Sequence, residues 1–166
     1  MLRPARLYIY HLLCHWMPET SCFALKRALL RWAGAKIGKG VRICSSATIL
    51  GAGTLSIGED TWIGQNVLMT ASGKIEIGDH VDIGPLVYLG NGTHEIDPVN
   101  VRSAGNGVCK DIAVESGCWL GARATILPGV RIGRKTVVGA GSLVNKDLPP
   151  EVVAVGVPAG ILRKLT

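Results

Sequence analysis

An aliphatic side chain returns at almost every sixth position of this chain, from Ile37 to Val144. Glycine often follows it, and a small or β-branched residue usually stands four positions after it. A short fixed period of this kind is typical of a repeat architecture, in which each repeat packs on its neighbours. The fifteen aliphatic positions are Ile37, Ile43, Ile49, Ile57, Ile63, Met69, Ile77, Ile83, Leu89, Val114, Leu120, Ile126, Ile132, Val138 and Val144.

A period of six is neither the 3.6 of an α-helix nor the simple alternation of a β-strand. We interpret three hexads as one turn of a triangular prism, with a short strand on each face and the aliphatic side chain pointing inward. Successive turns then pair as parallel strands, which satisfies backbone groups between turns. The hexads therefore predict an all-β parallel β-helix of about five coils within residues 37–148. Cys44 and Cys118 occupy repeat positions, so we expect them to be core residues.

The repeat breaks in three places. Two extra residues follow the third hexad (Leu55 and Ser56) and the sixth (Ile75 and Glu76), and we expect them to form corner bulges that leave the register intact. The third break separates Leu89 from Val114 and contains a polar segment. This segment predicts one long loop, 95–113, that leaves the prism, and long loops within regular repeats are often functional.

Residues 1–36 lie before the repeat and hold six Lys or Arg but one acidic residue, a net charge of +5. Two helices are expected there, over 4–16 and 21–33, with Thr20 or Ser21 capping the second and Gly34 ending it. Three interpretations stay open: a solvated helix face, a cover for the open end of the prism, or peripheral contact with an anionic membrane. The apolar run is too short to span a bilayer, and no signal-peptide cleavage pattern follows it.

The composition excludes several other functions. The five cysteines form no CxxC pair, which favours a reducing compartment such as the cytoplasm, with the inner membrane face as an alternative site of contact. No metal-ligand spacing is present, so no metal is expected. The remaining 130 residues are nearly neutral and poor in aromatic residues, which argues against nucleic-acid binding.

The hexads resemble those of the left-handed β-helix acyltransferases, and residues 118–164 resemble the C-terminal signature of the galactoside, maltose and nodulation O-acetyltransferases. The matching motifs are the Trp-Leu-Gly start, LPGV, GAGS, KDLPP and VGVPA. The basic helical N-terminus is more similar to acetyltransferases of bacterial polysaccharide pathways. The resemblance implies a left-handed helix, an acetyl-CoA donor, a sugar or glycan acceptor and a homotrimer, with 149–166 as a C-terminal extension.

The resemblance also implies a catalytic base. His94 stands at the start of the long loop, where the family has its catalytic histidine. An imidazole in this position can take the proton of an acceptor hydroxyl as the oxygen attacks a thioester. Asp97 or Glu95 could orient the imidazole, or Asp97 could bind the acceptor together with Asn66 and Glu95.

The cofactor positions are carried over from the family residue by residue. Trp119 is expected beside the pantetheine arm, Gly121 and Ala122 along it with an amide that could face the oxyanion, and Ala140 against it. Asn145, Lys146 and Arg163 are expected at the outer part of the cofactor. Two alternatives to a sugar O-acetyltransferase stay open, an N-acyltransferase of nucleotide-linked amino sugars and a non-catalytic β-helix scaffold.

Overall fold

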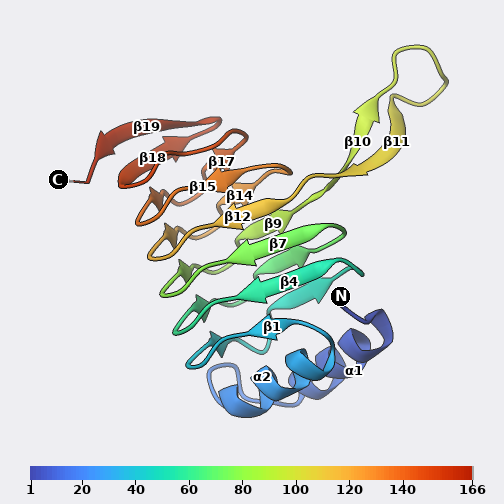
Figure 1. Ribbon diagram of the computed structural model, residues 1–166, viewed down its shortest axis with the longest axis vertical. Coiled ribbons are helices and arrows are strands. Elements are labelled where there is room, and N and C mark those ends of the chain that lie inside the picture. Colours follow the sequence, from blue (N-terminus) through green and yellow to red (C-terminus); the bar gives the residue numbers. More distant parts are fainter. Residues whose placement is uncertain (166) are drawn as a thin grey trace.

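The chain forms a triangular prism of stacked coils that two helices close at one end (Figure 1). The structure is a computed structural model that describes residues 1–165. Each complete coil contributes one short strand to each of three mainly parallel sheets, and five complete coils are present among these residues. Ile132 also bridges to Leu148 and β18 joins the second sheet, so a partial sixth turn follows.

The three sheets form the faces of the prism. The first face contains β1 (Lys36–Ile37), β4 (Thr54–Ile57), β7 (Lys74–Ile77), β12 (Ile112–Val114) and β15 (Arg131–Ile132). The second face contains β2 (Arg42–Ile43), β5 (Trp62–Ile63), β8 (Asp82–Ile83), β13 (Trp119–Leu120), β16 (Val137–Val138), β18 (Val152–Gly156) and the antiparallel β19 (Ala159–Lys164). The third face contains β3 (Thr48–Leu50), β6 (Leu68–Thr70), β9 (Tyr88–Gly90), β14 (Thr125–Ile126) and β17 (Leu143–Val144).

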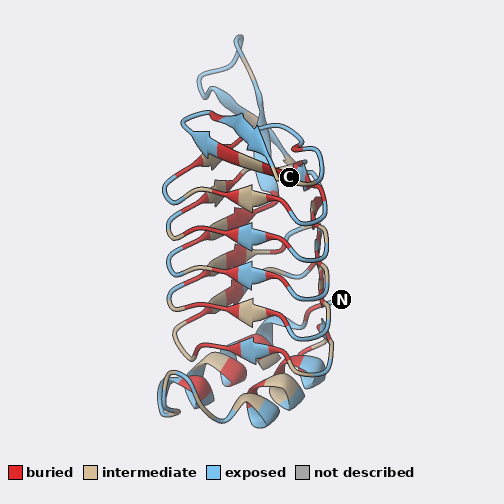
Figure 2. Cartoon of the chain, turned by 90° about the vertical axis from the view of Figure 1, so that its left-hand side faces the viewer, coloured by how far each residue is buried: buried red, intermediate tan, exposed pale blue. Residues whose placement is uncertain are grey.

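The inward positions are the ones that the six-residue period predicts. All fifteen aliphatic residues of the series are at most 7% exposed, and Figure 2 shows buried positions along the strands of the coils. Cys44 and Cys118 are buried as expected, and burial raises the pKa of each thiol to about 11. Removal of this continuous aliphatic column from water is the main stabilising contribution to the prism.

The two extra residues in each early coil extend strands of the first face, so the expectation of corner bulges is wrong. Leu55 pairs with Ile75, and Ile75 pairs with Ile112, with all three side chains buried. A bulge would have left a residue unpaired, whereas here the added pair continues the alternation with Leu55 inside and Ser56 outside. The register between coils is intact, as expected.

Two helices, α1 (Pro4–His15) and α2 (Phe23–Trp32), lie across the N-terminal end of the prism close to their expected bounds (Figure 1). The expected cap by Thr20 or Ser21 is wrong, because Cys22 is the N-cap residue and no side chain caps α2. Gly34 does end α2. It adopts a positive φ, and the amides of Gly34 and Ala35 donate to the last carbonyls of the helix.

Basic side chains of α2 satisfy the open edge of the first coil. The amides of this coil donate to the second coil, for example Gly38 to Ile57, so alternate carbonyls face the helices without a strand partner. Three cations donate to them: Arg31 to Ile37 (2.7 and 2.9 Å), Arg27 to Val41 (2.9 Å) and Lys26 to Ile43 (3.1 Å). Residues 1–36 therefore cover the end of the prism, and half of their basic residues bind its backbone.

Candidate functional site

The long break in the repeat is an antiparallel hairpin of β10 (Gly92–Ile96) and β11 (Ala104–Cys109), which projects from the corner between the third and first faces (Figure 1). The expected loop, 95–113, starts three residues later than the hairpin does. His94 lies on β10 opposite Gly107. The break in the repeat therefore marks where the chain leaves the prism, and the antiparallel pairing of β10 with β11 is seen only in the structure.

The imidazole of His94 is held by one backbone carbonyl. Its Nδ1 lies 2.9 Å from the carbonyl oxygen of Gly105. A carbonyl can only accept a hydrogen bond, so Nδ1 carries a proton in this contact, and the tautomer that the contact favours has its lone pair on Nε2. The side chain is exposed and faces a hollow of 380 Å³, which is lined by Ser72, Gly92, Thr93, His94, Gly107, Val108 and Cys109.

Asn91 anchors the base of the hairpin and was not found by the sequence analysis. It is fully buried, and its Oδ1 accepts from the backbone amides of Ser72 (2.9 Å) and Gly73 (3.0 Å) in the coil below. The amide of Lys110, where the chain returns, donates to the Asn91 carbonyl (2.9 Å). Asn91 thus ties both ends of the hairpin to the prism. A polar residue directly after Gly90, at the point where the repeat stops, is the signal that could have identified it.

Asp97 organises the turn at the far end of the hairpin. Its carboxylate accepts from the backbone amides of Val99 (2.9 Å) and Asn100 (3.0 Å) and from the side-chain amide of Asn100. These bonds, the side-chain one foremost, lower the pKa of Asp97. In this arrangement Asp97 shapes the loop near His94, while Gly105 holds the imidazole; Glu95 is exposed on β10.

A second group of predicted residues stacks at the corner between the second and third faces. Gly121 and Ala140 lie in successive coils, where a Cβ on Gly121 would be 2.6 Å from the amide nitrogen of Ala140. The carbonyl of Ala122 accepts from the amide of Gly141 (2.8 Å). Trp119 lies just before this corner on the outside of the second face and is 57% exposed. Asn66 belongs to the same corner, two coils earlier.

The remaining cofactor candidates lie elsewhere on the prism. Asn145 and Lys146 are exposed and follow β17, at the same corner from which the hairpin departs. Arg163 is exposed on β19, next to Val153 of β18. The structure therefore brings together two groups, one at each edge of the third face, and does not join them within a single chain.

The third face, which separates the two groups, has an uncharged outer surface. Its outward residues alternate with the buried Ile49, Met69, Leu89, Ile126 and Val144. Within the described strands these outward residues are all aliphatic, aromatic or hydroxyl-bearing: Thr48, Leu50, Leu68, Thr70, Tyr88, Thr125 and Leu143. An uncharged sheet face between two candidate half-sites is suited to contact with another copy of the chain.

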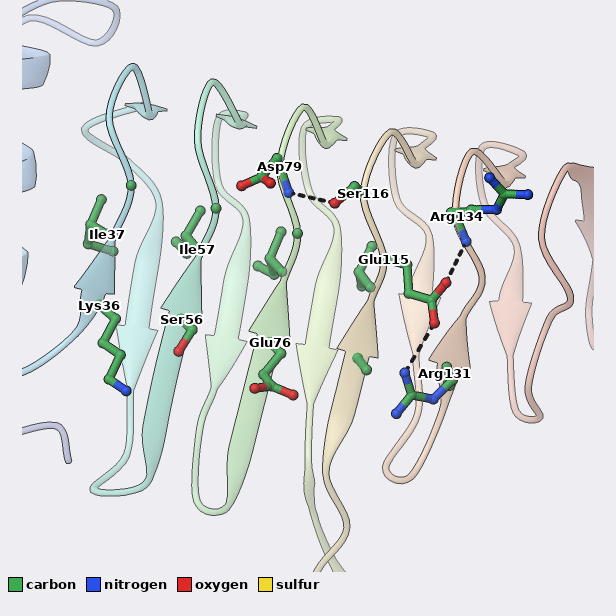
Figure 3. Close-up of a pocket in the computed structure, with 16 residues that line it drawn as sticks. Lys36, Ile37, Ser56, Ile57, Glu76, Asp79, Glu115, Ser116, Arg131 and Arg134 are labelled. Carbon is green, nitrogen blue, oxygen red and sulfur yellow. Dashed lines mark hydrogen bonds and ion pairs between the residues drawn. The ribbon is translucent and has the colours of Figure 1, made fainter.

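The first face differs, because it carries charges that neutralise one another. A hollow of 810 Å³ runs along it (Figure 3), and Glu115 accepts there from the Arg131 side chain (3.1 Å) and from the backbone amide of Arg134 (2.9 Å). Lys74 and Glu76 form another ion pair (2.7 Å). The residues lining this hollow include none of the predicted site residues in residues 1–165, so we do not assign the catalytic site to it.

Among residues 1–165, no group of three or more His, Cys, Asp or Glu side chains is placed to hold a metal ion. Neither helix in this part of the chain has the length and apolar character needed to cross a membrane.

Residues 111–146 match the family model described as bacterial transferase hexapeptide (six repeats). The chain is 38% identical over 149 residues to an Escherichia coli K12 protein named as a colanic acid biosynthesis acetyltransferase, WcaF, and the match covers 90% of this chain and 79% of that protein. It is 39% identical over 115 residues to a galactoside O-acetyltransferase of Lactococcus lactis, covering 69% of this chain. That match spans only about half of the relative, 55% of its length.

Solved structures support the same comparison. A hexapeptide-repeat acetyltransferase of Vibrio cholerae, crystallised with acetyl coenzyme A, aligns over 98% of this chain and 87% of its own with a TM-score of 0.79 and 31% identity. The similarity of fold therefore extends along nearly the whole chain.

Proposed function

Because the chain belongs to the hexapeptide-repeat acetyltransferases, we propose that it transfers the acetyl group of acetyl-CoA to a hydroxyl of a sugar or polysaccharide precursor. The observation that carries the mechanism is the hydrogen bond of His94 Nδ1 to the Gly105 carbonyl, which leaves Nε2 free as a base. The relatives named for galactoside acetylation and colanic acid biosynthesis support a sugar as the acceptor class.

In this proposal His94 acts as general base and then as general acid. A sugar hydroxyl has a pKa far above 7, so it attacks a thioester slowly unless its proton is removed during the attack. Nε2 takes that proton while the new C–O bond forms at the acetyl carbon. When the intermediate collapses, the C–S bond breaks and the imidazolium returns the proton to the sulfur of coenzyme A. The two steps together move one proton from the sugar hydroxyl to the sulfur of coenzyme A through Nε2, and they require no metal.

The corner that contains Gly121 and Ala122 is the proposed binding place of the thioester. The amide of Gly121 already donates to the Val138 carbonyl (2.8 Å). The amide of Ala122 donates to no backbone carbonyl among residues 1–165. The Ala122 amide is therefore free to bind the cofactor arm or the oxyanion that develops during attack. Trp119, exposed beside this corner, offers an apolar wall for the arm, while Ala140 lets the arm lie close to the coil.

We propose a homotrimer in which the uncharged third faces turn toward one another. His94 lies at one edge of the third face and Ala122 at the other edge. In a cyclic assembly, the hairpin of one chain then lies against the Ala122 corner of its neighbour, and three equal sites form. Asn145, Lys146 and Arg163 remain proposed contacts of the outer cofactor. Asn66, Glu95 and Asp97 remain proposed contacts of the acceptor.

The central test replaces His94 by Ala. Coenzyme A release with a panel of sugar acceptors should fall by ~10²–10⁴-fold, the usual contribution of a general base. Because the His94 side chain is exposed, the circular dichroism spectrum of the variant and its thermal stabilisation by acetyl-CoA should match those of the wild-type protein. Full activity would remove His94 from the mechanism. Lack of stabilisation of the unchanged protein by acetyl-CoA would instead favour the scaffold alternative.

A complementation experiment tests whether the site is shared between chains. His94→Ala chains and Ala122→Trp chains, each expected to be inactive, are mixed after mild dissociation. If each site combines two neighbours, random trimers should recover about a quarter of the unchanged activity, since each of the two required residues is intact with even odds. If one chain supplied the whole site, the mixture would stay inactive.

A further inference from the structure

The outer surface of the helical cap is apolar although it faces away from the prism. One side of α1 packs on the prism through Leu7, Tyr10 and Cys14, which are buried. The opposite side follows the helical spacing with Tyr8, Leu12 and Trp16, which are 71%, 52% and 82% exposed. A surface helix usually shows a polar outer side, so an apolar stripe here calls for a partner.

The outer side of α2 extends this surface. Leu25 and Trp32 are 50% and 43% exposed. The Arg6 guanidinium of α1 lies 4.8 Å above the ring of Trp32 and donates to its carbonyl (2.8 Å), so the outer sides of the two helices adjoin. We call this surface, with Tyr8, Ile9, Leu12, Leu13, Trp16, Leu25 and Trp32, the cap face.

The charges around the cap face are almost all positive. Residues 1–36 carry a net charge of +5, and three of their six cations, Lys26, Arg27 and Arg31, are turned toward the prism. Their one carboxylate, Glu19, is turned toward the prism, where it accepts from the backbone amide and the hydroxyl of Ser46. Arg3 is exposed and donates from its side chain to no other side chain within the described residues, and its amide donates to the Ala33 carbonyl beside Trp32. The apolar surface is therefore bordered by Arg3 and by Arg6, which lies over Trp32, and the one acid of this segment is turned away from it.

We propose that the cap face binds the surface of an anionic lipid bilayer, with the helices lying in the plane of the interface. Tryptophan and tyrosine favour the headgroup region, and exposed cations are attracted by anionic lipid. The twelve residues of α1 extend about 18 Å, well short of a ~30 Å hydrocarbon core, so the helix inserts only its outer side. A second copy docking on the same face would bring Arg3 and Arg6 of both chains together without an acid of this segment to pair them, which opposes self-association.

Vesicle sedimentation tests this surface. Phosphatidylcholine vesicles with about 30% phosphatidylglycerol as the anionic lipid are mixed with the wild-type protein and with a Tyr8→Ser, Leu12→Ser, Trp16→Ser variant. All three side chains are exposed, so the variant should fold and acetylate a soluble sugar normally. Its partition coefficient should fall by at least ~100-fold, because each lost apolar contact contributes about a factor of ten. The matched control is Ile161→Ser, a similarly exposed residue at the opposite end of the prism.

The possible outcomes distinguish a lipid surface from a second copy of the chain as the partner of the cap face. Binding that needs the anionic lipid, weakens at high salt and is lost only in the cap variant supports the proposal. The proposal is overturned if the wild-type protein and the cap variant bind the vesicles equally, or if neither protein sediments with the vesicles. A further outcome is that the wild-type protein forms assemblies larger than the proposed trimer without lipid. If the cap variant abolishes them, a second copy occupies this face, and the proposal is overturned as well. Each of these results is independent of whether His94 is the catalytic base.

Discussion

Replacement of Asn91 by Ala should loosen the hairpin and slow catalysis while acetyl-CoA binding persists. Asn91 Oδ1 accepts from Ser72 and Gly73, whose amides are partly exposed, so each lost bond should cost about 1 kcal/mol, the low end for an unsatisfied donor. Lost packing should add about 1 kcal/mol. The buried Nδ2 of Asn91 has no partner among the described residues, and its removal should return about 1 kcal/mol.

The net destabilisation is therefore about 2 kcal/mol, which corresponds to a fall in Tm of roughly 4–8 °C for a chain of this size. Turnover should fall more than stability suggests, because the hairpin that carries His94 is held to the prism by Asn91 and by the return strand. The KM for acetyl-CoA should stay nearly constant, because Ala122 and Ala140 lie at another corner.

Calorimetry at one fixed protein concentration gives the stability, and single-turnover kinetics gives the rate of acetyl transfer. The matched control is Asn100→Ala, which removes a similar amide from the exposed turn of the same hairpin. It should leave Tm within about 2 °C, since surface substitutions are usually worth less than 0.5 kcal/mol. Unchanged Tm and unchanged turnover in Asn91→Ala would refute the role of this residue as the hairpin anchor.

Two other predictions concern the cofactor and the thiols. Arg163→Ala should raise the acetyl-CoA KM by ~5–30-fold with little change in kcat, which is equivalent to about 1–2 kcal/mol for one exposed charged contact. Lys164→Ala is the neighbouring control. An unchanged KM in Arg163→Ala would mean that another residue contacts the nucleotide. Burial raises the pKa of Cys44 and Cys118 to about 11 and also raises that of Cys14, so their reactive thiolates are scarce at pH 8. Iodoacetamide should therefore label only the exposed Cys22 and Cys109 in the folded protein and all five thiols in urea, and mass spectrometry that found rapid labelling of Cys118 would contradict the buried assignment.

Family membership and the parallel β-helix were predictable because both depend on local pattern, whereas the left hand of the helix was implied by the family resemblance alone. An inward position must be apolar in every coil, so the period of six identifies Ile83 or Leu120 as core without knowledge of its partners. The prediction of a hexapeptide-repeat acyltransferase is confirmed by the comparisons. The position of His94 beside the large break was also visible in the sequence, while its catalytic role remains a proposal.

The two-residue insertions show where pattern stops being sufficient. From the sequence, the added residues Leu55 and Ser56 are compatible with a bulge or with a longer strand. Their pairing with Ile75 and Glu76 of the next coil shows that they extend the strand. Lys26 and Arg31 likewise read as surface charge in a helix. Their bonds to the carbonyls of Ile43 and Ile37 depend on which edge of the prism is left open.

The six-residue spacing specifies the coil, its core positions and the place where the chain leaves it, because the spacing is a local property of the chain. The contacts that hold His94, and the positions of the two half-sites, depend on the arrangement of the coils and the hairpin in space. The Gly105 carbonyl reaches His94 because the hairpin folds back on itself, and Asn91 meets Ser72 because two coils stack. Contacts between residues many positions apart depend on how the backbone is arranged in space, and the spacing of residues along the chain does not specify them.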